Sequence, residues 1–331
     1  MPDKVITICI PVYNGARFLF DAVRSALAQE YSPLEVLVVD NQSNDGTLGT
    51  LAGVEDPRLN VIALDDHVGM AENWDRTAAL ANGDLVLMLS ADDCLLPGAL
   101  SVLAAPFHQN PELDLVLGRP RHLDEAGNRP FGVALRSMPA GDITELESFV
   151  ISHTPAININ AILFRRGLAR FRPSAGLVCD LDLLLTLGRE GRKGLVVDRE
   201  VLSYREHPDA LSTDRVRMWR ETIDCYLHHL TQSYRPHAYR WRLFKTLHWF
   251  GSHVTGTDQE GSFREKLALA SPYLSGRQRM ALKLGQIPLL REAASRLRNL
   301  ASRLPKSDQA AEAVYPPPIK KTSSSREKLS D

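Results

Sequence analysis

The stretch that decides the fold is residues 5–14, which read Val-Ile-Thr-Ile-Cys-Ile-Pro-Val-Tyr-Asn. Residues 5–11 are a largely apolar run, typical of a strand that is buried on both faces of a sheet. A second such run, residues 35–40, ends at Asp40, and a third, residues 85–89, is followed by Ser90-Ala91-Asp92-Asp93. Because the carboxyl ends of parallel strands meet at one edge of a sheet, we expect these polar side chains to lie close together.

The segments between these strands have the periodicity of helices. Residues 15–29, 47–51 and 71–81 predict three helices, the last two on either side of a strand at 59–64. This alternation predicts an α/β fold with a sheet flanked by helices. Pro97 begins a further helix. The predicted catalytic domain, residues 1–214, is completed by strands at 113–117, 195–198 and 201–205, a helix at 181–187, a turn at 124–128 and an apolar segment at 157–164.

The remainder of the chain differs in charge. Residues 215–331 hold 21 Lys and Arg against 10 Asp and Glu, a net charge of +11, whereas residues 1–214 hold 18 against 30, a net charge of −12. Residues 215–304 predict a basic helical region, with helices at 216–250 and at 277–304 and a kink or a break at Pro288. Residues 305–331, rich in Lys, Ser and Pro, predict a disordered tail.

The composition of the 331 residues, 44% hydrophobic and 24% charged, is that of a globular protein with one large domain and an appendage. No apolar run approaches the roughly 18 residues that span a membrane, and no leader precedes the first strand, which predicts a cytoplasmic protein. The basic region carries no zinc, helix-turn-helix or RNA-binding signature, which disfavours nucleic acid as a partner. Widely spaced cysteines predict buried thiols rather than disulfides or a zinc site: Cys9, Cys94, Cys179 and Cys225.

Six short motifs, taken in their order along the chain, resemble those of family-two glycosyltransferases. They are Pro11-Val12-Tyr13-Asn14-Gly15, Val38-Val39-Asp40, Asp45-Gly46-Thr47, Gly69 with Asn73, Ala91-Asp92-Asp93, and Tyr204-Arg205-Glu206-His207. The resemblance covers residues 4–214. It implies a GT-A fold, a nucleotide-diphosphate sugar as donor, a divalent Mg²⁺ or Mn²⁺, and inversion at the anomeric carbon. The chain departs from the pattern at Ser90, where the family commonly has an acid.

The resemblance also implies a nucleotide site. Asp40 would accept a hydrogen bond from the nucleobase imide, while Pro11, Val12 and Tyr13 would line the base pocket. The remaining nucleotide contacts would come from Asn14, Asn73 and Ala91. A carboxylate acceptor suits the N3–H of uracil, which favours a UDP donor. Many relatives carry Asp at the position of Asn41, so the preference for the base stays open.

A sugar diphosphate gains negative charge on its leaving group as the glycosidic bond breaks, and a divalent cation stabilises that charge. Such ions take one or two carboxylates together with phosphate oxygens. Asp92 is the predicted ligand, with Asp93 as a second ligand or a helix cap. His207 is predicted to reach the metal or the diphosphate, because imidazole ligates metals and, when protonated, neutralises phosphate.

The acceptor hydroxyl must lose its proton as it attacks, which requires a general base. Asp180 is the predicted base. It precedes an amphipathic helix, in a segment that resembles the acidic pair of the family with Cys179 in place of the first acid. Capping of this helix is the alternative role for Asp180.

Together these inferences predict an inverting, metal-dependent glycosyltransferase that moves a sugar from a UDP-sugar to a hydroxyl of a glycan or a lipid-linked acceptor. A sugar nucleotidyltransferase is a second interpretation, although it needs a Gly-rich phosphate loop. A catalytically degenerate nucleotide-binding assembly subunit is a third, motivated by Ser90 and Cys179. The basic face of residues 277–304 leaves two interpretations open: peripheral association with the inner face of a membrane, or packing on the catalytic domain.

Overall fold

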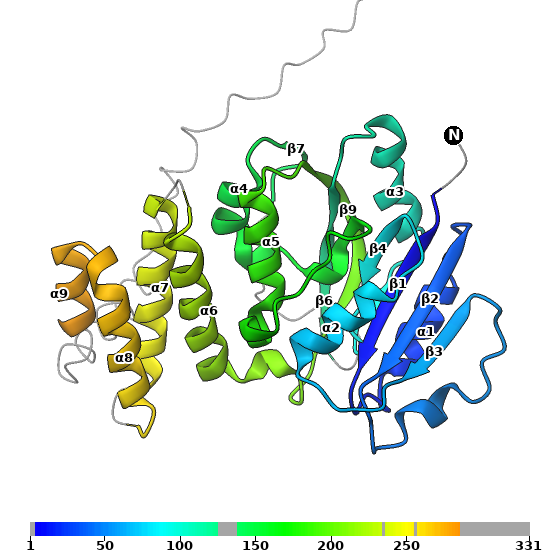
Figure 1. Cartoon of the computed structure of the whole chain (residues 1–331), viewed down its shortest axis with the longest axis horizontal. Coiled ribbons are helices and arrows are strands. Elements are labelled where there is room, and N and C mark those ends of the chain that lie inside the picture. The colour runs from blue at the N-terminus through cyan, green and yellow to red at the C-terminus, as the bar shows by residue number, and fades with distance from the viewer. Residues whose placement is uncertain (1–3, 125–137, 234–235, 255–256, 285–331) are drawn as a thin grey trace, which may run out of the picture. The chain divides into compact units, whose positions relative to one another are not determined.

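The computed structural model describes residues 4–124, 138–233, 236–254 and 257–284. At its centre lies a mixed sheet with the strand order β3-β2-β1-β4-β8-β6-β9-β5, and β7 pairs with β9 (Figure 1). The strands are β1 (Ile6–Val12), β2 (Leu34–Asp40), β3 (Leu59–Ala63), β4 (Leu85–Met88), β5 (Cys94–Leu95), β6 (Leu115–Asp124), β7 (Gly141–Ile143), β8 (Ile162–Arg165) and β9 (Gly194–Glu206).

The first half of the sheet is parallel. β2 and β4 both pair in parallel with β1, and β3 pairs in parallel with β2. The connections are α1 (Leu19–Leu27), the 3₁₀ helix η1 (Thr47–Leu51) and α2 (Met70–Ala79). Every residue of β1 is buried, as a strand covered on both faces requires. The α/β order predicted for residues 5–89 is therefore confirmed.

Three strands of the second half, β5, β7 and β8, run opposite to β1. β8 is antiparallel to both β4 and β6, and β9 is parallel to β6, so β9 runs in the same direction as β1, β2 and β4. Helix α5 (Cys179–Arg189) directly precedes β9 and runs back across the sheet, so it begins at the edge where these strands end (Figure 1). We call this edge the carboxyl rim; it includes the ends of β1, β2, β4 and β9.

Apolar side chains fill both faces of the sheet. On one face they come from α1 and from α3 (Ala99–Gln109), and on the other from α2, α4 (Leu146–His153) and α5. Short 3₁₀ helices complete this part: η2 (Thr154–Ala156), η3 (Ile159–Ala161), η4 (Pro173–Val178) and η5 (Leu211–Thr213). The result is three layers with the sheet in the middle.

The C-terminal helices belong to the same compact unit as the sheet, Met1–Leu282. The Tyr239 hydroxyl donates to Glu147 Oε1 on α4 at 2.7 Å, and Arg242 donates to the carbonyl of Ile151. None of the described helices is long and apolar enough to cross a bilayer. The helices are α6 (Arg215–Leu230), α7 (Pro236–Val254), α8 (Glu260–Ala270), η6 (Ser271–Tyr273) and α9 (Gly276–Leu284).

Some predicted elements differ from the structure or fall outside it. The helix predicted at 216–250 is two helices, α6 and α7. Only the beginning of the helix predicted at 277–304 is described, as α9. Pro288, the rest of that helix and the tail at 305–331 lie outside the described residues, as does the predicted turn after Asp124.

Candidate active site

The ends of β1 and β2 are joined by hydrogen bonds at the carboxyl rim. The Asn14 amide N–H donates to Ser43 Oγ at 2.8 Å, and the Asn44 amide N–H donates to Asn14 Oδ1 at 3.0 Å. Asn14 and Gln42 have positive φ angles of 50° and 61°. Backbone strain of this kind persists where the surroundings enforce it and clusters at functional sites. The two strand ends therefore form a rigid, preformed loop pair.

Asp40 is held in this loop pair with one oxygen unused. Its side chain is 3% exposed, and Oδ2 accepts the Ser43 amide N–H at 3.1 Å. Within the described part of the chain, Asp40 Oδ1 is buried and has no hydrogen-bond partner, and the same holds for Oδ1 of Asn73 on α2. Buried acceptors without donors are costly, and they are most readily explained by a donor that arrives with a ligand.

The other predicted base-pocket residues lie beside Asp40. Pro11 and Val12 are buried in β1, whereas Tyr13 is 49% exposed, with its ring centroid 4.4 Å from that of His67. Asn41 donates to the carbonyl of Val68 at 2.8 Å and accepts the amide N–H of Val68 at 2.9 Å. Asn41 thus holds the loop that carries His67 against Tyr13.

Asp92 and His207 meet at the same rim. Asp92 follows β4 and His207 follows β9, and His207 Nε2 lies 3.1 Å from Asp92 Oδ2. The Asp92 side chain is 35% exposed, and the buried His207 Nδ1 has no hydrogen-bond partner in the described ranges. A partly open carboxylate next to an imidazole fits a divalent cation that also binds phosphate oxygens and water. Ala91, the residue before Asp92, is half-buried in the same turn.

Asp93 points inward, which differs from both roles expected of it. Its side chain is 1% exposed; Oδ1 accepts the amide N–H of Arg205 at 2.9 Å and Oδ2 accepts the side-chain amide of Asn160 at 2.6 Å. Each of its oxygens already accepts a hydrogen bond from the protein, and the N-cap position of α3 is occupied by Gly98. Burial, and then the charge of Asp92, raise the pKa of Asp93 to about 8. Asp93 ties the end of β9 to the turn after β4.

Sequence reasoning missed two residues that support this turn. Asn160 is buried and binds Ser90 as well as Asp93, donating to Ser90 Oγ at 2.9 Å. The sequence offered one sign of this role, because Asn160 is a polar residue inside the apolar segment 157–164. The Phe18 ring lies 4.5 Å from the guanidinium of Arg205 and 4.8 Å from the His207 ring. Phe18 reads as one more apolar residue of a helix, so its contacts across the fold could not be anticipated.

Asp180 lies in the first turn of α5, at the carboxyl rim. It is half-buried, its Oδ1 accepts the Leu181 amide N–H at 2.7 Å, and burial raises its pKa above the usual value. The preceding segment contacts α2: the Phe171 amide N–H donates to Asp75 at 2.9 Å. The segment that leads into α5 is thus attached to the helix that carries Asn73. Among the described residues, no hydrogen bond joins Asp180 to Asp40 or Asp92.

Two residues further along, Asp182 belongs to a buried cluster. It accepts hydrogen bonds from Arg172 and lies 3.0 Å from His229 Nε2 on α6. Burial opposes its ionisation, but the hydrogen bonds of His229 and Arg172 outweigh this and lower its pKa to about 2. In the described part of the chain, Asp182, Cys225 and His229 are the one group of three or more His, Cys, Asp or Glu residues whose ligand atoms lie close enough together to hold a metal ion. Because Arg172 already neutralises Asp182 and burial keeps Cys225 a thiol, we interpret the cluster as a clasp between α5 and α6.

The comparisons with known proteins agree with this geometry. Glycosyl transferase family 2 matches residues 7–166. An uncharacterized protein of Mycobacterium tuberculosis is 29% identical over 234 residues, which cover 66% of this chain and 72% of that protein. Succinoglycan biosynthesis protein ExoO of Rhizobium meliloti is 38% identical over 100 residues, which cover 30% of this chain and only 29% of ExoO.

Two solved structures share the fold. S. aureus TarS 1-349 in complex with UDP-GlcNAc superimposes with a TM-score of 0.62 at 16% identity, covering 88% of this chain and 87% of that one. The mannosyltransferase PcManGT from Pyrobaculum calidifontis, in complex with GDP-Man and Mn²⁺, gives 0.56 at 17% identity, covering 91% and 88%. The chain therefore has the GT-A fold of these glycosyltransferase structures, as predicted. The match to glycosyl transferase family 2 spans 160 of the 331 residues of this chain.

Proposed function

We propose that the protein is an inverting glycosyltransferase that transfers a hexose-type sugar from a UDP-sugar to a hydroxyl of a glycan or a lipid-linked acceptor. The observation that carries this proposal is the carboxyl rim itself. It brings an unpaired buried carboxylate oxygen of Asp40 and the open Asp92–His207 pair to the edge where α5 presents Asp180. These groups match the three tasks of the reaction: holding a base, a diphosphate and an acceptor.

Asp40 is assigned to the nucleobase. Its Oδ1 points at no donor of the described protein, and the N3–H of uracil is a donor of suitable kind. Tyr13 offers an exposed ring for the base, while Asn14 and Asn73 supply polar groups next to it. The TarS complex contains a UDP-sugar, which supports UDP by analogy of fold, whereas PcManGT binds GDP-Man.

Asp92 and His207 are assigned to the metal. They would hold Mg²⁺ or Mn²⁺, which supplies positive charge to the departing diphosphate. Asp93 is assigned a positioning role, because both of its oxygens bind protein groups. Arg205 supports the same loop by donating from Nε to the carbonyl of Asp92 at 3.1 Å.

Asp180 is assigned as the general base that takes the proton of the acceptor hydroxyl. Burial raises its pKa, so the carboxylate is a stronger base than an exposed aspartate. In a single in-line displacement, the acceptor oxygen forms a bond to the anomeric carbon as the bond to the diphosphate oxygen breaks. The proton moves to Asp180 Oδ, and the configuration inverts. A polysaccharide acceptor is favoured by the similarity to ExoO, a succinoglycan biosynthesis protein, and to TuaG of Bacillus subtilis, a putative teichuronic acid biosynthesis glycosyltransferase.

A donor panel tests the proposal. Purified protein is incubated with UDP-, GDP- and TDP-sugars in the presence of Mn²⁺ or Mg²⁺, and nucleotide release is followed with and without a chelator. Release from a UDP-sugar that stops with the chelator is expected. Nucleotide release that continues at the same rate in the presence of the chelator would contradict the proposal. So would the absence of release from every nucleotide sugar. An intact UDP affinity in Asp180→Asn, together with lost transfer, would exclude a mere binding subunit.

The predicted membrane association remains a proposal. The segment on which it was based, 277–304, is described only up to residue 284. Binding to the inner face of a membrane would place the enzyme next to a lipid-linked acceptor.

A further inference from the structure

Helix α7 carries a surface that the catalytic proposal does not use. Its 19 residues include Arg240, Arg242 and Lys245, three histidines and two tryptophans, and no Asp or Glu. Its buried side packs on the rest of the fold through Tyr239, Leu243, Leu247 and Phe250. The opposite side of α7 is therefore the one that is available to a partner.

The exposed side of α7 is aromatic and cationic. Trp241 is 56% exposed and Trp249 is 53% exposed, although large aromatic side chains usually lie mostly inside a protein. They are eight residues apart, so both project from the same side of the helix. Lys245 lies between them, with its ammonium 5.8 Å from the Trp241 ring. Indole rings favour the headgroup level of a bilayer, where one end of the ring is apolar and the other is wet.

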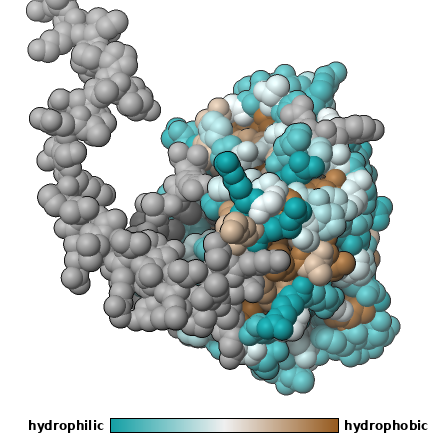
Figure 2. Space-filling model, turned by 90° about the vertical axis from the view of Figure 1, so that its left-hand side faces the viewer, coloured by the Kyte–Doolittle hydropathy of each residue, from teal (hydrophilic) through white to brown (hydrophobic). Residues whose placement is uncertain are grey.

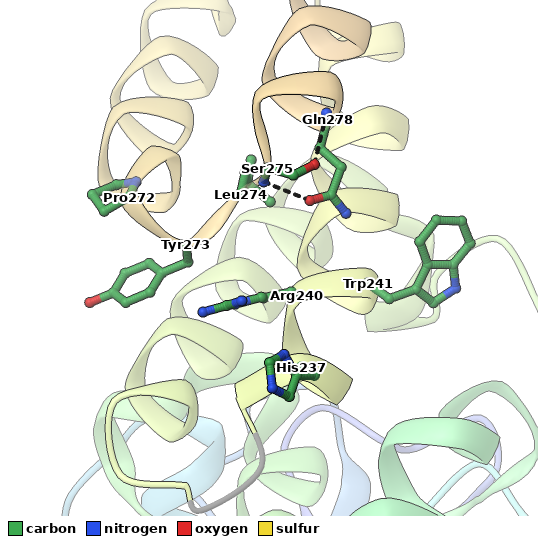
Figure 3. A pocket seen from close by; sticks show the side chains of 8 residues that line it. All are labelled: His237, Arg240, Trp241, Pro272, Tyr273, Leu274, Ser275 and Gln278. Carbon is green, nitrogen blue, oxygen red and sulfur yellow. Dashed lines mark hydrogen bonds between the residues drawn. The ribbon is translucent and has the colours of Figure 1, made fainter.

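A pocket of about 330 Å³ lies next to this side, between α7 and the η6–α9 segment. Figure 3 shows Arg240 extending toward Tyr273 on one side of the pocket and Trp241 on the other. Among the residues that the structure describes, none accepts a hydrogen bond from the buried Arg240 Nε, and none of those lining the pocket is a carboxylate. The polar groups that accompany Arg240 come from His237, Tyr273, Ser275 and Gln278. A guanidinium in such a pocket matches an oxyanion such as a phosphate.

The adjoining helices add apolar surface. Leu269 on α8 is 52% exposed and Met280 on α9 is 63% exposed. Figure 2 views the end of the molecule that bears these helices and shows hydrophobic patches among hydrophilic residues. A soluble partner would account for the apolar patches alone. The combination with two exposed indoles and a carboxylate-free cationic pocket is complementary to lipid headgroups.

We propose that the exposed side of α7, with the Arg240 pocket, docks on an anionic phospholipid bilayer, and that Arg240 binds a lipid phosphate. Trp241 and Trp249 enter the headgroup layer and Lys245 adds electrostatic attraction. This surface is separate from the residues assigned to catalysis. It adds α7 to the segment 277–304, for which membrane association was predicted.

Vesicle sedimentation with the full chain tests the proposal. The vesicles contain either equal parts of phosphatidylglycerol and phosphatidylcholine or phosphatidylcholine alone. We expect at least about tenfold tighter binding to the anionic vesicles, weakened by added salt. Trp241→Ala with Trp249→Ala should reduce that binding about tenfold or more, and Arg240→Gln about fivefold. Tryptophan fluorescence of the wild type should shift to the blue only with anionic vesicles.

Matched controls separate this surface from general effects. Phe20→Ala removes another exposed aromatic ring and Arg199→Gln another exposed cation, and neither should change binding. Donor hydrolysis in solution should be unchanged in the α7 variants, so failure here leaves the catalytic proposal intact. Equal binding by wild type and the double tryptophan variant would overturn the proposal. The proposal would also be overturned if Arg240 bound soluble polyphosphate with the same affinity as the protein binds anionic vesicles, because no lipid would then be required.

Discussion

Replacing Asp40 by asparagine should weaken UDP binding without weakening the fold. In the wild type, Oδ2 accepts the Ser43 amide N–H and Oδ1 has no donor. In Asp40→Asn the one remaining side-chain oxygen must keep accepting the Ser43 amide N–H. The new side-chain NH₂ group then faces the N3–H of uracil, and two donors cannot form a hydrogen bond with each other. A hydrogen bond to a charged group contributes about 1.5–3 kcal/mol, so the Kd for UDP should rise by about 10- to 150-fold.

Isothermal titration calorimetry with UDP and CDP measures this effect. Cytosine has an acceptor at N3, so Asp40→Asn should lose less affinity for CDP than for UDP. Removing a buried charge with an unpaired oxygen should leave the unliganded protein as stable as the wild type or more stable. Asp142→Asn, an exposed carboxylate on β7, serves as the control. An unchanged UDP affinity in Asp40→Asn would refute the assignment of Asp40 to the base.

Three further predictions follow from the rim and the clasp. Asp180→Asn should lower kcat by about 10²- to 10⁴-fold with little change in UDP affinity, measured by transfer assays and titration; an unaltered rate would leave Asp180 as a structural residue. Asn160→Ala should cost about 1–3 kcal/mol in urea unfolding because Asp93 loses its donor, whereas the exposed Asn60→Ala should cost little. Asp182 has its pKa lowered from 3.8 to about 2, so its ionised form contributes about 2 kcal/mol, fully present above pH 4 and lost as the pH falls through 2. The stability difference between wild type and Asp182→Asn should therefore shrink on acidification over that window, and a constant difference would contradict the clasp.

The sequence was sufficient for the parallel half of the sheet because its strands are buried on both faces and end in polar residues. The ends at Asp40 and Asp92 could be predicted to lie at one edge, since parallel strands share their direction. The orientation of Asp93 could not be predicted, because a pair of carboxylates looks the same whichever one turns inward. Here Asn160 and the backbone of Arg205, both remote in sequence, decide that orientation.

The C-terminal helices show a second limit of sequence reasoning. Helical periodicity and positive charge were readable, but the periodicity did not locate the break between α6 and α7. It also did not distinguish the packed side of α7 from the side that exposes Trp241 and Trp249. That distinction depends on contacts such as Tyr239 with Glu147, which join segments 92 residues apart.

The most direct test of the central claim is anomalous diffraction from crystals grown with UDP and Mn²⁺. The account predicts an anomalous peak beside Asp92 and His207, bridging to the diphosphate, with the uracil N3 within hydrogen-bond distance of Asp40 Oδ1. A peak at Asp182, Cys225 and His229 instead, or UDP bound away from the carboxyl rim, would contradict it.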